Sequence, residues 1–207
     1  MFSKGKTEAI FLRVLAGALG VFLVTVGGTF APRLSPLVQP TEMAMAANPA
    51  PDGACQAVWD ASEKVFSIPT HFYFTHTGAG RKSTTTESIY VDGAMYSLVN
   101  GKWFRTATSP EDLKSQMVEN RKNITNASCH EVRDESVNGE NATVYSVHAE
   151  TPRGIHDSQI WISKSKKLIL REETDAVLTG RNGRGHVSLR FDYNNVQAPK
   201  VWSNLGQ

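Results

Sequence analysis

The sequence predicts an α+β fold: one long, curved antiparallel sheet, with a helix before it and a second helix inserted midway. Aromatic and β-branched segments alternate with polar residues from Thr70 to Tyr193. Closely spaced hairpin signals separate these segments, namely Asp92-Gly93, Asn100-Gly101 and Asn138-Gly139. Few helices are available to cover one face of so long a sheet, and this shortage favours a curved, partly open sheet with a cavity.

Two segments carry helical signals instead. The first helix is expected from Gly53 to about Phe66, where a proline follows closely. The second begins after Ser109, a good N-cap that precedes a proline and two acidic residues, and continues to about Asn123. The strands are expected at residues 70–77, 84–91, 95–99, 103–106, 129–137, 142–150, 159–163, 168–176 and 186–193.

The first 46 residues have the layout of a secretory signal. Three basic residues precede an apolar run over residues 14–26, and Ala44-Met45-Ala46 provides a small-residue cleavage site. We therefore expect export to a bacterial periplasm. An uncleaved anchor over residues 9–31 is the alternative, because that stretch approaches the length needed to span a bilayer.

The remaining chain is neutral overall. Residues 1–46 hold four of the 22 Lys and Arg and two of the 20 Asp and Glu, which leaves 18 of each sign. No basic stripe argues for nucleic acid as a partner. We expect a linker at residues 47–52, a single domain at 53–198 and a C-terminal tail at 199–207.

The chain contains only two cysteines, Cys55 and Cys129. An even pair in an oxidising compartment is most simply one disulfide. Such a bond would tie the first helix to the segment near Cys129.

Sequence motifs for catalysis, metals or cofactors are missing. His71 and His76 are five residues apart and should face opposite sides of a strand. His148 and His156 flank a turn and could face each other across a hairpin, but no third ligand accompanies them. The adjacent carboxylates Glu172-Glu173 should also point to opposite faces. We therefore expect a protein without a metal or other cofactor that is not an enzyme.

Aromatic residues are spread over most of the predicted strands. They either form an ordinary core or line an apolar concave surface for an acyl chain or an apolar protein segment. The predicted ligand-binding residues are Phe72, Phe74, Tyr90, Trp103, Trp161 and Phe191.

Three segments resemble the LolA-like half-barrel of periplasmic lipoprotein carriers and sensors. Tyr90-Val-Asp-Gly93, followed by Tyr96 through Trp103, is similar to the strand, turn, strand meander of that group. The segment from Ile160 to Arg171 resembles its hairpin, and Phe191 to Val196 resembles its closing strand. The resemblance covers roughly residues 53–198 and implies a half β-barrel.

These observations predict non-catalytic binding of a lipid, a lipoprotein acyl chain or another apolar ligand in a half-barrel cavity. A membrane-anchored sensor module that recognises a protein of the cell envelope is the alternative. A retained N-terminus would favour the sensor.

Overall fold

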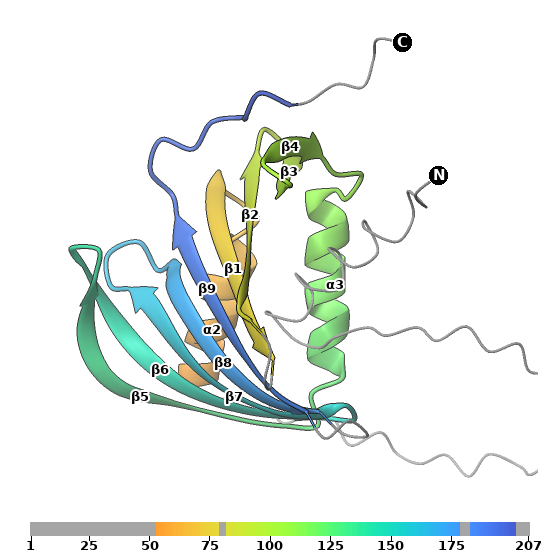
Figure 1. Cartoon of the computed structure of the whole chain (residues 1–207). Helices are drawn as coiled ribbons and strands as arrows, with labels where there is room; N and C mark the ends of the chain where they lie inside the picture. Colours follow the sequence, from red (N-terminus) through yellow and green to blue (C-terminus); the bar gives the residue numbers. More distant parts are fainter. Residues whose placement is uncertain (1–52, 79–81, 179–182, 202–207) are drawn as a thin grey trace, which may run out of the picture.

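Nine antiparallel strands form one open, curved sheet in the computed structural model, which describes residues 53–78, 82–178 and 183–201 (Figure 1). The first 52 residues, which include the predicted signal segment and linker, lie outside the described residues. The helices are α2 (Gly53–Lys64) and α3 (Pro110–Lys122). The strands are β1 (Thr70–Gly78), β2 (Thr84–Val91), β3 (Ala94–Val99), β4 (Lys102–Arg105), β5 (Asn126–Val137), β6 (Glu140–Thr151), β7 (Gly154–Ser163), β8 (Ile169–Leu178) and β9 (Gly183–Asp192). The predicted α+β class is confirmed.

The strand order is β4-β3-β2-β1-β9-β8-β7-β6-β5. Every neighbouring pair is a sequential hairpin except β1 and β9, which join the first strand of the domain to its last. The segment containing α3 carries the chain from β4 at one edge to β5 at the other (Figure 1). The two edge strands do not pair with each other, so the described sheet stays open.

Local turn chemistry explains the hairpins. Asp92 and Gly93 both have positive φ, at 52° and 68°, and so do Asn138 and Gly139, at 51° and 82°. Two successive positive φ angles define the type I′ turn, whose twist matches that of the flanking strands. The predicted hairpin signals are therefore confirmed. Several strands are longer than predicted: β7 begins at Gly154, five residues earlier than expected.

Helix α3 begins with a capping box. The backbone N–H of Asp112 donates to the Ser109 hydroxyl at 3.1 Å, and the backbone N–H of Ser109 donates to the Asp112 carboxylate at 3.0 Å. This reciprocal pair satisfies two backbone donors that a helix start otherwise leaves unpaired. The predicted start after Ser109 is confirmed.

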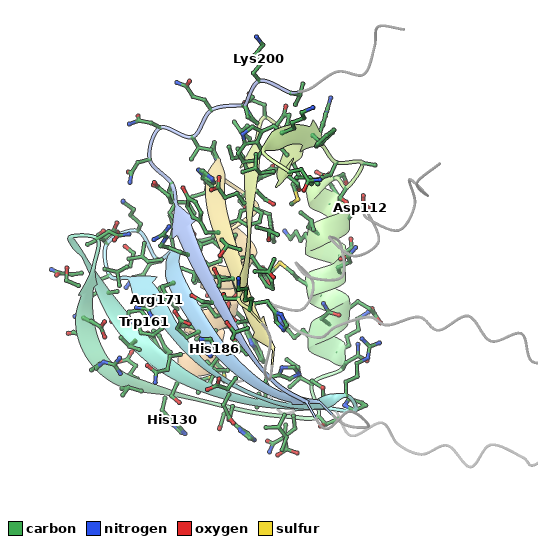
Figure 2. All side chains as sticks on the ribbon, in the orientation of Figure 1. Asp112, His130, Trp161, Arg171, His186 and Lys200 are labelled. Carbon is green, nitrogen blue, oxygen red and sulfur yellow. A yellow bond between two sulfur atoms is a disulfide. The ribbon has the colours of Figure 1, made fainter. Side chains whose placement is uncertain are left out.

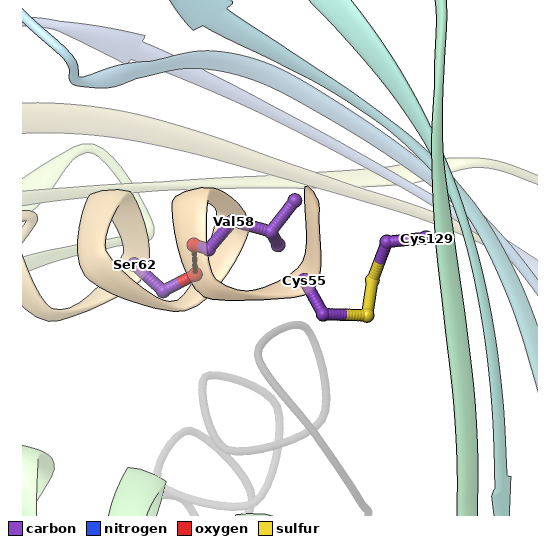
Figure 3. The surroundings of a disulfide bond; sticks show 4 residues. All are labelled: Cys55, Val58, Ser62 and Cys129. Atoms are coloured by element: carbon purple, nitrogen blue, oxygen red, sulfur yellow. Dashed lines mark hydrogen bonds between the residues drawn. A yellow bond between two sulfur atoms is a disulfide. The ribbon is translucent and has the colours of Figure 1, made fainter. Parts of the chain in front are cut away.

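Helix α2 is tied to the sheet by the predicted disulfide. Cys55 in its first turn is bonded to Cys129 of β5, with the Cα atoms 5.0 Å apart (Figure 3). Both cysteines are buried. Within the described chain, neither helix is long and apolar enough to cross a membrane.

The core lies on one side of the sheet, which we call the helical face. There Val58 and Ala61 of α2, and Leu113 and Met117 of α3, pack against apolar side chains of six strands. The opposite side, which we call the outer face, carries a smaller buried cluster of Ala142, Val144, Trp161 and Leu170. The two helices thus cover the same side of the sheet.

Candidate functional site

Four of the six predicted ligand-binding aromatics gather on the helical face. Phe72 of β1 lies directly opposite Phe191 of β9, with ring centroids 6.5 Å apart, and both are buried. Phe74 lies two residues further along β1 and is also buried. Tyr90 is partly exposed, and its ring meets that of Phe66 edge to face at 6.4 Å. These four side chains belong to one apolar cluster, in which residues of both helices also take part.

The other two aromatics lie on the outer face. Trp161 is directly opposite Val144 and Arg171, so strand alternation turns it away from Ile160 and Ile162. The Arg171 guanidinium lies 4.7 Å from the Trp161 ring centroid (Figure 2). Trp103 of β4 meets the ring of His71, also on the outer face, at 6.1 Å. The sheet register therefore divides the predicted set between two faces, and ligand contact by these six residues stays a prediction.

The helical face also holds a carboxyl group, that of Glu172 in β8. Glu172 is directly opposite Ile160 of β7 and Leu189 of β9, which are core residues. Only 4% of its surface is exposed, whereas its neighbour Glu173 lies on the outer face beside Ser188 and His186. The predicted opposite orientation of this pair is confirmed, but the deep burial of Glu172 was not foreseen.

Only one carboxyl oxygen of Glu172 is hydrogen-bonded, and its partner is a hydroxyl group. The Thr174 hydroxyl donates to Glu172 Oε1 at 3.0 Å, and Ser158 Oγ lies 2.8 Å from Thr174 Oγ1. Glu172 Oε2 is buried without a hydrogen-bond partner. Desolvation raises the pKa of Glu172 to about 8; the hydrogen bond from Thr174 opposes this rise and the charge of Glu173 adds to it. At neutral pH the carboxyl is therefore mostly protonated.

His156 extends this polar strip toward the end of β7. It lies two residues before Ser158 on the same face and opposite Ala149 of β6. Its Nε2 is buried without a hydrogen-bond partner, and burial lowers its pKa, which favours the neutral imidazole. The helical face thus combines an apolar surface with a short row of neutral polar groups.

The expected facing of His148 and His156 is wrong. His148 points to the outer face, where its Nδ1 lies 2.6 Å from a carboxylate oxygen of Asp157, because these two residues are direct partners between β6 and β7. His156 is the residue next to Asp157 on β7, so its side chain lies on the opposite side of the sheet, the helical face. His71 and His76 lie on opposite faces, as predicted. Over the described ranges, no group of three or more His, Cys, Asp or Glu side chains is placed to hold a metal ion.

The outer face carries histidine and carboxylate pairs instead. His186 lies 2.8 Å from both Asp175 and Glu173, and hydrogen bonds to these carboxylates, that of Asp175 first, raise its pKa. These groups are solvent-exposed or half-exposed and already partner one another.

No family model matches the chain, and no curated protein matches it. The solved structures that are similar include the following three. LprF from Mycobacterium bovis shares 13% identity at a TM-score of 0.39, over 73% of this chain and 96% of that one. The Pseudomonas aeruginosa MucA/MucB complex shares 14% at 0.35, over 70% and 61%. A LolA superfamily protein from Nitrosomonas europaea shares 8% at 0.24, over 67% and 91%. The similar structures thus include a member of the superfamily that the sequence resembles.

Proposed function

We propose that this protein is a non-catalytic, exported binding protein that holds a lipid, a lipoprotein acyl chain or a similar apolar ligand on the helical face. The observation that carries the proposal is the apolar surface of Phe72, Phe74, Tyr90 and Phe191, which lies on an open sheet under only two described helices. A ligand there would bury apolar surface, which contributes about 25 cal/mol per Å² before ordering costs.

The two helices are attached to the rest of the domain by different interactions, and this difference supports a route by which the ligand enters. Helix α2 is covalently joined to β5. Helix α3 places Leu113 and Met117 in the core and pairs with α2 through Arg121, which lies 3.0 Å from Glu63 and over the Trp59 ring. Partly exposed ion pairs of this kind contribute at most about 1 kcal/mol. We therefore infer that α3 moves aside to admit the ligand while α2 stays in place.

Uptake of a fluorescent lipopeptide by delipidated protein tests this proposal. Tyr90→Ala, on the helical face, should weaken binding because it removes part of the apolar surface. Trp103→Ala is the matched aromatic substitution on the outer face. A loss of ligand binding in Tyr90→Ala alone places the ligand under the helices. A loss of binding in both variants assigns a role in binding to the outer face as well. Absence of uptake by the unsubstituted protein would refute the proposal.

The disulfide supports an exported location, since such bonds persist in oxidising compartments. We propose a bacterial periplasm, with residues 1–46 removed. Mass spectrometry of the purified protein should then find an N-terminus at Ala47. An intact N-terminus would instead favour an anchor at residues 9–31.

The free edge of the sheet favours a second candidate, a protein-interaction or sensor module of the cell envelope. Strand β5 forms that edge, and Val132 at its bulge is 51% exposed. An edge strand offers unpaired backbone groups to an extended segment of a partner. A stable envelope-protein complex that Val132→Lys abolishes, with no bound lipid, would favour this candidate over a carrier.

A further inference from the structure

The most unusual group on the helical face is the Glu172 carboxyl, because a core position opposite Ile160 and Leu189 would ordinarily hold an apolar side chain. Carboxyl groups at such positions are normally paired with a cation. In the described parts of β1 and β6 to β9, the strand positions on the helical face include no lysine or arginine. The burial of Glu172 is therefore accommodated as a neutral acid.

The hydrogen bonds leave one oxygen of the acid available to a ligand. Thr174 has a single hydroxyl hydrogen and donates it to Glu172 Oε1. Ser158 must then be the donor in its 2.8 Å contact with Thr174. In the arrangement in which Thr174 donates, the proton of the neutral acid lies on Oε2, the oxygen that has no partner. In the reverse arrangement the proton lies on Oε1 and is donated to Thr174. A ligand acceptor beside Oε2 selects the first arrangement, because it gives the O–H a partner inside the apolar cluster.

We propose that Glu172 Oε2–H donates a hydrogen bond to the carbonyl oxygen of an ester- or amide-linked acyl chain, whose alkyl part packs against the aromatic residues of the helical face. This inference rests on the proposed function and specifies its ligand class. A neutral acyl carbonyl supplies an acceptor without bringing a charge. A free fatty-acid anion would add a negative charge beside described strand positions that include no lysine or arginine, and a plain alkane would leave the donor unsatisfied.

Three probes of equal chain length separate these ligands: a long-chain acyl methyl ester, the ether that lacks its carbonyl, and the alkylammonium. Binding to delipidated full-length protein is measured at about pH 6.5, where the Glu172 carboxyl is neutral. We expect the ester to bind roughly three- to tenfold more tightly than the ether, the size of effect that one net hydrogen bond produces. The infrared carbonyl band of the bound ester should move to lower frequency.

Two substitutions assign the effect to Glu172. Glu172→Leu should abolish both the ester preference and the infrared shift while ether binding persists. Glu172→Gln should retain them in large part, because its amide N–H is still a donor. Glu173→Gln, on the outer face, is the matched control and should leave the preference unchanged. Circular dichroism confirms that each variant is folded.

Each contrary result has a distinct meaning. Equal binding of ester and ether, or a preference that survives in Glu172→Leu, overturns this inference while the proposed function stands. Strongest binding of the alkylammonium also overturns it, because Glu172 would then act as a carboxylate toward a cation. If no probe binds, both the inference and the proposed function fail.

Discussion

Replacing Glu172 with glutamine should stabilise the protein at neutral pH. The side chain keeps its shape and its acceptor for Thr174 but no longer has a proton to take up on folding. The pKa of Glu172 is about 8 in the folded protein, against an ordinary value of 4.5. Between these values the folded protein binds one proton more than the unfolded chain, so its stability falls as pH rises through this window.

The expected magnitude follows from the width of that window. At pH 7 the Glu172 side chain is ionised in the unfolded chain and mostly neutral in the folded protein. Each pH unit above the ordinary pKa of 4.5 lowers the free energy of unfolding by about 1.4 kcal/mol, so keeping the proton costs roughly 3 kcal/mol at this pH. Glutamine avoids this cost. The stability gain of Glu172→Gln should therefore be near zero at about pH 4 and grow to roughly 3 kcal/mol at about pH 7.

Urea unfolding followed by circular dichroism at a series of pH values measures this gain. The difference between wild type and variant isolates Glu172, because His148 and His186, whose pKa values are raised by hydrogen bonds to nearby carboxylates, are common to both proteins. A difference that does not change with pH, or a variant that is less stable at neutral pH, would refute a buried neutral acid at this position.

The other predictions concern the disulfide, the cap and the two faces. Replacing Cys55 and Cys129 with alanine should lower the free energy of unfolding by up to about 4 kcal/mol, since the bond spans a separation of 74 residues; unchanged urea unfolding would contradict this. Ser109→Ala should cost about 1 kcal/mol through loss of the helix cap, and a midpoint equal to that of wild type would argue against the capping box. Phe72→Ala should cost about 3 to 5 kcal/mol and Trp103→Ala much less, because only Phe72 is fully buried; a reversed order in thermal unfolding would count against the assignment of faces.

Local features of this protein were predictable because neighbouring residues alone determine them. Ser109 and the proline after it specify a helix start through their own backbone preferences and side-chain acceptor. Asp92-Gly93 and Asn138-Gly139 adopt the positive φ angles that such pairs favour, and this sets the hairpins. The disulfide was also predictable, since the chain offers only one pair of cysteines.

The candidate site could not be read from such local signals. Period-two alternation predicts which residues of a strand share a side, but it does not say which side the helices will cover. The pairing of β1 with β9 decided that Phe72 and Phe191 meet under the helices. Trp161 faces outward because it alternates with Ile160 and Ile162, which the core takes up. A Glu at an inward strand position was the only available hint of the buried acid.

The sequence by itself determined the helix start, the turns, the class of fold and the cross-link, because each depends on a few residues and their intrinsic conformations. The tertiary structure alone decided that Glu172 is buried and neutral. Its surroundings, Ile160 and Leu189, lie on strands that only the completed sheet brings beside it, and the loss of water there raises its pKa.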